Sequence, residues 1–198
     1  MSTKAIRLIS DQDLVQQYIK GQEASLEELI RRHKSKIYTS IYHLVKDSNL
    51  AEDIFQDTFI KVINTLKTSK YNEEGKFLPW VIRIAHNLVI DHFRKEKRKP
   101  MAANVEGFDI FDVIKSKDES IEDRIIREQN HKELRILIHL LPSEQKEVLI
   151  MRHFAELSFK EISDITGVSI NTALGRMRYA LNNLRKMMHT KELALGNV

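Results

Sequence analysis

The stretch that most constrains this chain is residues 157–186, LSFKEISDITGVSINTALGRMRYALNNLRK, which has the pattern of two helices joined by a tight turn. Ser158 and Glu161 have the spacing of a capping box, in which the hydroxyl and the carboxylate each satisfy a free backbone N–H. Gly167 is expected to end the first helix, because a left-handed backbone costs glycine little, and Ser169 can cap the second. The apolar residues of the second helix recur with helical period: Ala173, Met177, Ala180, Leu181 and Leu184. The pattern predicts a helix-turn-helix.

The remaining face of the second helix is polar and basic. It contains Asn171, Thr172, Gly175, Arg176, Arg178, Tyr179, Asn182 and Asn183. No acidic residue lies between Asp164 and Glu192, whereas several arginines and lysines do. Arginine and asparagine read base edges in the major groove, and basic groups meet phosphates. The pattern therefore favours binding of duplex DNA over the alternative, a solvated helix of an ordinary bundle, since solvated faces usually mix both charges.

Composition narrows the class of protein. The 198 residues include only 6 Gly and 3 Pro, with 42% hydrophobic and 30% charged residues, which favours a helix-rich globular chain. The net charge of +4 is mild, so local basic patches matter more than the total. The absence of cysteine excludes disulfides and thiolate chemistry and fits a reducing compartment. Because no apolar run approaches about 20 residues, we expect a cytoplasmic protein without direct membrane insertion.

Three helices are expected in the first part of the chain. The first begins at Ser10 and ends near Gly21, a longer one follows, and Asn49 with Glu52 opens the third. The polar face of the third helix begins with Glu52, Asp53, Gln56 and Asp57. Acidic residues in a first turn commonly complement the helix dipole. The same patch is also suited to docking a basic partner helix, and the sequence leaves both interpretations open.

A fourth helix is predicted over residues 77–97. Its expected buried face is Phe77, Trp80, Val81, Ile84, Ala85, Leu88, Val89 and Phe93. Its expected exposed face is Arg83, His86, Asn87, Asp91, Arg94 and Lys95. The basic end can simply complement the helix dipole. Aromatic residues beside a basic helix instead suggest single-stranded nucleic acid, for which Tyr71 and Trp80 are the available stacking platforms, although Trp80 taken alone suits the core better.

No catalytic or metal site is predicted. His86, Asp91 and His92 are metal-binding residue types, but the spacing of His86 and Asp91 places them poorly on one helical face. The sequence contains no glycine-rich phosphate loop and no evident nucleophile with its base. We therefore expect neither an enzyme nor a cofactor.

The predicted architecture is all-α, with two small helical bundles joined by an extended linker. The first domain covers residues 1–97, the linker 98–119, and the second domain, which contains the helix-turn-helix, 120–198. Helical periodicity fails in the linker, where proline, glycine and acidic residues alternate with apolar ones. Pro142 suits the first turn of the helix that precedes the helix-turn-helix.

Three segments, taken in this order, resemble the bacterial sigma-70 superfamily, specifically its extracytoplasmic-function (ECF) group. The segment AEDIFQDTFIKV is similar to the helix by which these proteins bind the β′ clamp helices of RNA polymerase. The segment FLPWVIRIAHNLVIDHFRKEKR is similar to their −10-reading helix. The segment LPSEQKEVLIMRHFAELSFKEISDITGVSINTALGRMRYAL is similar to their −35-reading domain.

The resemblance implies a site role for particular residues. It implies RNA polymerase binding by Asp53, Gln56 and Asp57. It implies reading of the −10 element by Tyr71, Arg83, His86, Asn87, Arg94 and Lys95, with Tyr71 in a loop that captures a flipped-out base. It implies contacts to the −35 region by Asn171, Thr172, Leu174, Gly175, Arg176, Arg178 and Tyr179. Leu174 departs from the family, because some members have a DNA-contacting arginine there; a leucine can still meet a thymine methyl.

The resemblance also implies the partners. They are promoter DNA and core RNA polymerase, with contacts to the β′ clamp helices, the β flap and the RNA exit channel, through which the linker would pass. An anti-sigma protein is a further partner that the family allows. Two other classes remain open from the residues alone: a DNA-binding regulator whose first bundle is a sensor, and a helical metal-dependent hydrolase. The regulator leaves the acidic and basic helices of the first bundle unexplained, and the hydrolase needs more ligands than the histidines supply.

Overall fold

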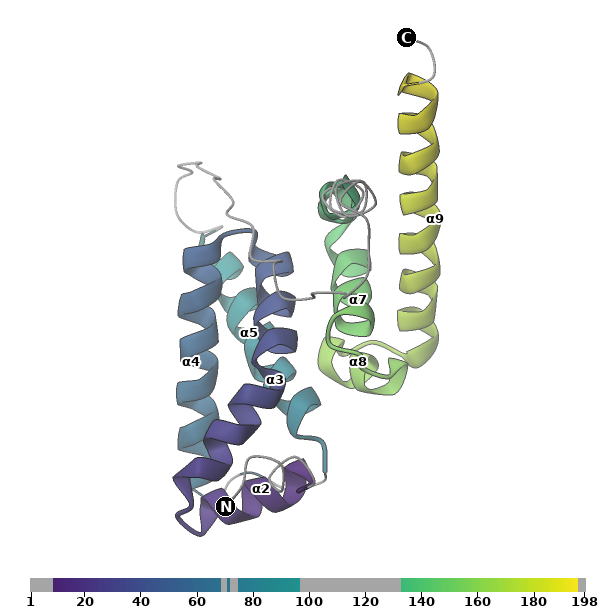
Figure 1. The fold of residues 1–198 in the computed structure, drawn as a ribbon. Helices are drawn as coiled ribbons and strands as arrows, with labels where there is room; N and C mark the ends of the chain where they lie inside the picture. The colour runs from purple at the N-terminus through teal and green to yellow at the C-terminus, as the bar shows by residue number, and fades with distance from the viewer. Residues whose placement is uncertain (1–8, 69–70, 72–74, 97–132, 196–198) are drawn as a thin grey trace, which may run out of the picture. The chain divides into compact units, whose positions relative to one another are not determined.

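The computed structural model describes residues 9–68, 71, 75–96 and 133–195, and the regular structure within these ranges is helical. The chain forms two compact units, one N-terminal and one C-terminal (Figure 1). The predicted all-α architecture with two helical bundles is confirmed for this part of the chain. The predicted linker, residues 98–119, and the predicted start of the second domain at residue 120 lie outside the described residues. No helix of the described ranges has both the length and the apolar character needed to span a membrane.

Among the described residues, the first unit contains four helices. They are α2 (Asp11–Ile19), α3 (Glu23–Val45), α4 (Ser48–Lys67) and α5 (Phe77–Glu96). Helices α3, α4 and α5 each pack against the other two, and α2 packs across one end of α3 (Figure 1). The core between them is made of fully or almost fully buried side chains: Leu14, Val15, Leu29, Ile37, Ile41, Val62, Leu66, Phe77 and Val81. Burial of these apolar faces stabilises helices that would be marginal alone.

Local capping fixes where two of these helices begin. Ser10 caps α2 as predicted, because its Oγ accepts a hydrogen bond from the backbone N–H of Asp13 at 3.1 Å. The expected start of the third predicted helix, α4, at Asn49 is wrong. Asp47 is the N-cap of α4 and accepts from the N–H of Leu50 at 2.9 Å. Lys46, at φ 61°, has already turned the chain, so α4 begins before the predicted residue.

A charged network joins α2 to α3. The buried carboxylate of Glu28 accepts from Arg31 at 2.7 Å and from Arg32 at 2.8 Å. Arg32 also donates to Asp11 at 3.0 Å, and Asp11 lies 2.6 Å from His33 Nε2. The hydrogen bond with His33 holds the pKa of Asp11 below its usual value, and the bonds from Arg32 and Arg31 do the same for the pKa of Glu28. The network holds α2 against α3.

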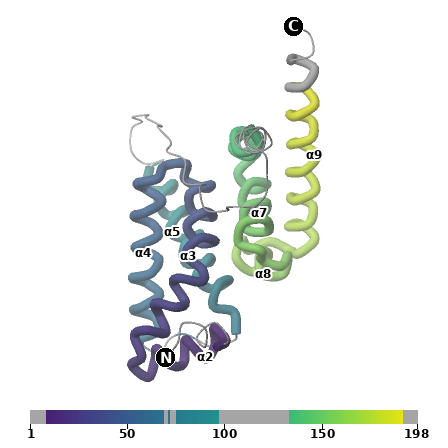
Figure 2. Tube along the Cα trace, in the orientation of Figure 1, coloured from purple at the N-terminus to yellow at the C-terminus, as the bar shows by residue number. Residues whose placement is uncertain are grey.

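The second unit contains α7 (Ser143–His153), α8 (Phe159–Thr166) and α9 (Ile170–Leu195), and residues 133–140 are also helical. Helix α9 packs against both α7 and α8 (Figure 1). Figure 2 shows α9 as one unbroken coil. Its packed face contributes Ala173, Ala180 and Leu184 to the core, α7 contributes Val148, and α8 contributes Ile162. Leu181, which the sequence assigns to this face, is 39% exposed, because it follows Ala180 and is turned about 100° away from it.

The predicted helix-turn-helix is confirmed down to its hydrogen bonds. Ser158 Oγ accepts from the N–H of Glu161 at 3.3 Å, and the Glu161 carboxylate accepts from the N–H of Ser158 at 2.7 Å. Gly167 ends α8 at φ 70°, the left-handed conformation that favours glycine. Ser169 Oγ then accepts from the N–H of Thr172 at 3.0 Å and caps α9.

Candidate nucleic-acid and protein interfaces

The N-terminal half of α9 presents the predicted DNA-reading residues on two adjacent faces. Residues three, four and seven apart share a helical face. One face is therefore made by Asn171, Leu174, Gly175 and Arg178, and the next by Thr172, Arg176 and Tyr179. Gly175 and Arg176 are half-buried, and the other five residues are exposed. The structure thus brings the predicted set together on accessible surface of the helix that follows the turn.

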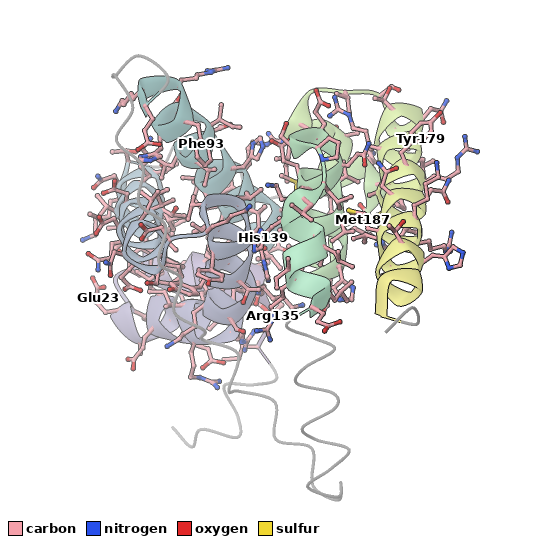
Figure 3. The ribbon with its side chains drawn as sticks, turned by 90° about the horizontal axis from the view of Figure 1, so that it is seen from above. Glu23, Phe93, Arg135, His139, Tyr179 and Met187 are labelled. Carbon is pink, nitrogen blue, oxygen red and sulfur yellow. The ribbon has the colours of Figure 1, made fainter. Side chains whose placement is uncertain are left out.

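Two contacts order this surface. The guanidinium of Arg178 lies 5.7 Å from the ring centroid of Tyr179, whose side chain is 56% exposed and is labelled in Figure 3. The Thr172 hydroxyl lies 2.9 Å from Ser169 Oγ, which ties its rotamer to the helix cap. A cation over an aromatic face is weakly attracted to it, so the pair restrains the arginine while its donors stay accessible.

Gly175 has no packing role in the second unit. A Cβ built on it meets no atom within 4 Å, and its backbone is ordinary helix. Glycine in a helix interior costs about 1 kcal/mol relative to alanine. Neither packing nor backbone conformation therefore explains a glycine here, and the missing Cβ leaves the helix backbone open to close approach.

The sequence pattern places Asn183 on the exposed face of α9, but in the structure its side chain is bonded to α7. Its Nδ2 donates to Gln145 Oε1 of α7 at 2.8 Å, and the side chain is half-buried. The pair connects α9 to α7 beyond the DNA-reading half of the helix.

Helix α5 presents a second basic surface, with one correction to the prediction. Arg83, Asn87, Arg94 and Lys95 are exposed, as expected. His86 is only 8% exposed, so its predicted place on the exposed face is wrong. Its neighbours one turn away on the buried face are Ile82 and Val89, which are 2% exposed. The buried face of α5 is rotated relative to the predicted one. Four residues expected in the core are half-buried or exposed: Trp80, Ile84, Leu88 and Phe93.

An aromatic cluster of Phe77, Trp80 and Tyr71, whose neighbouring rings are tilted by 57° and 45° to one another, leads from the core of the first unit to its surface. Phe77 is buried, the centroid of Trp80 lies 6.0 Å from it, and the centroid of Tyr71 lies 4.2 Å from that of Trp80. Both Trp80 and Tyr71 are half-buried. The cluster is therefore anchored in the core through Phe77, while Trp80 and Tyr71 remain partly accessible as a platform for an unstacked base.

The side chains at the basic C-terminal end of α5 form only long ion pairs with other described residues. Arg94 Nη1 lies 3.7 Å from Asp91 Oδ1, and both side chains are more than half exposed. His92 lies 3.5 Å from Glu96. Exposed pairs at such distances contribute little, so Arg94 can exchange its carboxylate for a phosphate. Within the described ranges no group of three or more His, Cys, Asp or Glu side chains is arranged to hold a metal ion.

The acidic face of α4 is not explained by the helix dipole. Because α4 begins at Ser48, its first turn contains no acidic residue. Asp53, Gln56 and Asp57 lie in later turns, where the dipole effect has faded, and all three are exposed. The structure adds one residue that the sequence analysis did not single out: Ile60 is 55% exposed on the same face. Carboxylates complement a basic partner surface, and an accessible apolar side chain adds area that such a partner can bury.

Comparison with known proteins places both units in one family. Residues 29–99 match the family model of sigma-70 region 2, and residues 137–186 match that of sigma-70 region 4. The two matched segments together cover more than half of the chain and contain the α4, α5 and α9 surfaces described above. The chain belongs to the sigma-70 superfamily, in its ECF group.

Individual relatives resemble the chain over almost their full length. It is 28% identical over 178 residues to the ECF RNA polymerase sigma factor SigW of Bacillus subtilis (strain 168), covering 88% of this chain and 94% of SigW. It is 27% identical over 182 residues to the RNA polymerase sigma-H factor of Pseudomonas aeruginosa, covering 90% and 93%. Among solved structures, CnrH in complex with the cytosolic domain of CnrY has a TM-score of 0.68 at 17% identity, covering 92% of this chain and 99% of CnrH, which shows the shared fold.

Proposed function

We propose that this chain is an ECF-type RNA polymerase sigma factor, which binds core RNA polymerase, recognises the −35 and −10 promoter elements and promotes DNA opening. The observation that carries the proposal is the pairing of region 2 and region 4 on one chain, each with an exposed basic recognition surface. A DNA-binding regulator with a sensor domain accounts for α9 alone. It leaves the exposed acidic face of α4 and the aromatic-basic surface of α5 without a role.

In this proposal α9 reads the −35 element as intact duplex. An α-helix fits the major groove, and Arg176 and Arg178 are suited to guanine edges or phosphates. Leu174, which is 44% exposed, is suited to a thymine methyl. Tyr179 and Thr172 lie beside these residues and complete the contact surface.

Helix α5 and the aromatic cluster read the −10 element as a separated strand. Asn87 offers an amide to the pairing edge of a base, and Tyr71 with Trp80 offers a stacking surface. Arg83, Arg94 and Lys95 meet the phosphates of the opened DNA. His86 is buried, so its proposed role is to support α5 from within the unit rather than to touch DNA.

The α4 face made by Asp53, Gln56, Asp57 and Ile60 docks on the clamp helices of core RNA polymerase. Carboxylates steer a basic partner surface, and the apolar side chain among them is buried on contact. The linker, residues 98–119, lies outside the described residues, and its passage through the RNA exit channel, with the second domain at the β flap, stays a prediction.

Cellular location and regulation follow from this role. A factor that acts on polymerase and promoter DNA works in the cytoplasm and initiates transcription without catalysing a reaction itself. One similar solved structure, with a TM-score of 0.62 at 17% identity, is the sigma factor RpoE in complex with the anti-sigma factor NepR from Bartonella quintana. We include an anti-sigma protein among the partners proposed for this chain.

A reconstituted runoff transcription assay tests the proposal. Sigma-free core polymerase, genomic promoter fragments and the purified chain should together give discrete transcripts, and omission of either protein should abolish them. Binding to core is measured in parallel by fluorescence anisotropy of the labelled chain. A chain that binds promoter duplex tightly alone, but neither binds core nor supports initiation, would favour the ordinary regulator.

A further inference from the structure

Helix α2 lies outside the part of the chain that matches sigma-70 region 2, and the proposed function gives it no role. The match begins at residue 29, whereas α2 covers Asp11–Ile19. Leu14, Val15 and Tyr18 bury the inner face of α2 in the core of the first unit. That apolar face accounts for the packing of the helix, but the polar first turn of α2 makes contacts of its own.

The first turn of α2 is held to α3 by hydrogen bonds and ion pairs. Arg32 Nη1 donates to the carbonyl oxygen of Ile9 at 2.7 Å and to Asp11 Oδ1 at 3.0 Å. The other carboxylate oxygen, Asp11 Oδ2, lies 2.6 Å from His33 Nε2. The side chains of Arg32, Asp11 and His33 are 19%, 28% and 15% exposed. Hydrogen bonds to a carboxylate are short and directional, so Asp11 fixes the orientation of the His33 ring.

The ring of His33 continues into the aromatic cluster of the −10 surface. Its centroid lies 5.8 Å from that of Phe77, the buried first residue of α5. The centroids of Phe77 and Trp80 lie 6.0 Å apart, and those of Trp80 and Tyr71 lie 4.2 Å apart. Protein interiors are close-packed, so a displaced ring also displaces the rings that it touches. A continuous series of side-chain contacts therefore leads from Asp11 to Tyr71.

The same turn of α2 also borders the chain just before α5. A Cβ built on Gly75 would lie 4.0 Å from Oε1 of Gln12, the residue after Asp11. Gly75 precedes α5 by two residues and has a φ of 70°, which glycine adopts readily. Helix α2 thus lies beside the start of α5 at two places, through the His33 ring and through Gln12.

We propose that α2 positions the base platform formed by Trp80 and Tyr71, and that His33 is the positioning residue between them. The inference rests on the proposed function, because this platform is the surface proposed to take an unstacked base. Asp11 orients the His33 ring, and the ring supports Phe77 and, through it, Trp80.

Histidine suits this position because it combines two properties. A ring nitrogen bonds the carboxylate of Asp11, while the flat ring packs beside Phe77. An apolar residue would fill the space against Phe77 but would not connect it to α2. Neither Asp11 nor His33 has to touch DNA, since both act through the aromatic cluster.

Tryptophan fluorescence tests the positioning in the free full-length protein. Trp80 is the only tryptophan of the chain, so its emission reports the cluster directly. Asp11→Ala should shift this emission to longer wavelength and increase its quenching by acrylamide, because the cluster loosens and admits water. Asp13→Ala is the matched control: it removes a carboxylate from the same first turn, but one that accepts from the Ser10 hydroxyl. An emission that Asp11→Ala leaves unchanged overturns the proposal.

Further variants separate this role from general stability. His33→Gln keeps a donor for Asp11 but removes the ring beside Phe77, and it should change the Trp80 emission as Asp11→Ala does. Glu28→Gln also removes ion pairs of α3, but it leaves the His33 contacts in place and should leave the emission unchanged. Thermal unfolding by circular dichroism gives the stability of each variant. An emission that follows the melting temperature across all of these variants contradicts a separate role for His33.

Promoter opening tests the consequence in the holoenzyme. Asp11→Ala and His33→Gln should each slow opening of a matched promoter by about threefold or more, whereas Asp13→Ala should change it by less than about 1.5-fold. Permanganate reactivity of unpaired thymines measures the opening. A template mismatched in advance around the −10 element should restore part of the loss. Equal slowing by Asp11→Ala and Asp13→Ala overturns the proposal.

The two measurements distinguish this inference from the proposed function. If the unmodified chain fails in the runoff assay while Asp11→Ala still shifts the Trp80 emission, α2 positions the cluster and the sigma role is wrong. If the unmodified chain initiates transcription and Asp11→Ala alters neither the emission nor opening, the sigma role stands and the positioning role is wrong.

Discussion

Helices α5 and α9 are both basic, but they present their recognition groups differently. On α9 the predicted contacts lie along one side of a single helix, starting directly after the turn that Gly167 makes possible. On α5 two basic residues lie in the last turn, and the aromatic groups belong to a cluster that begins in the core at Phe77. A long helix side suits the major groove of intact duplex, whereas an anchored aromatic platform suits bases that have left the stack. In the proposed function, this difference corresponds to closed-complex binding by the second unit and DNA opening by the first.

The largest expected effect follows from removing the duplex reader. Arg176→Ala combined with Arg178→Ala should weaken the closed promoter complex of the holoenzyme by about 2–4 kcal/mol, because two groups suited to bases or phosphates are lost. A template mismatched in advance around the −10 element should help this variant little. Gel-shift titration on matched and pre-melted templates measures both quantities. Full rescue by pre-melting would contradict the assignment of α9 to duplex DNA.

The corresponding change in the first unit is Tyr71→Ala. It should impair opening by about 1–3 kcal/mol, because a stacking surface for an unpaired base is removed. Pre-melted template should restore part of the loss, and Tyr71→Phe, which keeps the ring, should retain most of the activity. Permanganate reactivity of unpaired thymines reports the opening. If this variant and the double arginine variant respond alike to pre-melting, the two helices do not divide the work as proposed.

Loss of polymerase docking should impair promoter recognition by both the α5 and the α9 surface, because both act in the holoenzyme. Asp53→Ala combined with Asp57→Ala should weaken core binding by about 1–2 kcal/mol, and Ile60→Ser should weaken it further. Lys67→Ala is the matched control, since Lys67 is an exposed residue of α4 in its last turn. Core binding is measured by anisotropy and helicity by circular dichroism. Unchanged core binding both by the double aspartate variant and by Ile60→Ser would remove this face of α4 from the mechanism.

Acid stability should differ between the two units. The pKa values of Asp11 and Glu28 are lowered in the folded first unit. The stabilisation from these carboxylates is therefore present at neutral pH and is lost as the pH falls below about 4, through their folded pKa values. Glu28→Gln should lower the stability of the first unit by about 1 kcal/mol at neutral pH, with a smaller difference in acid. Amide hydrogen exchange in α2 and α3, against α8 as the internal control, measures the effect; an equal difference at both pH values would contradict it.

The smallest expected effect separates folding from recognition within α9. Gly175→Ala should stabilise the second unit by about 0.5–1 kcal/mol, because alanine favours helix and the added Cβ meets no atom of the protein. The same substitution should weaken −35 binding if DNA approaches the backbone at this position. Thermal unfolding and gel-shift titration give the two values. A gain in stability without any loss of binding would show that the glycine has no role in contact with DNA.

Local hydrogen bonds explain why much of the second unit could be predicted. The capping box of Ser158 and Glu161, the left-handed Gly167 and the cap at Ser169 each connect residues that are close in the chain. Such motifs depend little on distant packing. The −35 set on α9 follows from the same local pattern, because the helix start fixes which residues share a face.

The places where the sequence misled depend on packing between helices. His86 is buried because α5 turns a rotated face toward α3 and α4, and periodicity within α5 could not fix that rotation. Asn183 donates a hydrogen bond to Gln145 of α7, a residue distant in the chain. Ile60 is exposed because none of the described helices covers that side of α4. An exposed apolar residue cannot be told from a core residue by its type alone.

The sequence by itself therefore determined the helices of this protein, the helix-turn-helix and the family, since these rest on short-range hydrogen bonds, apolar period and motif order. The tertiary structure decided which groups of each helix remain accessible to partners. It buried His86, left Leu181 and Met188 exposed beside the arginines of α9, and placed Tyr71 against Trp80. The physical reason is that a side chain is buried only where another helix covers it, and that choice is made by the packing of the whole unit.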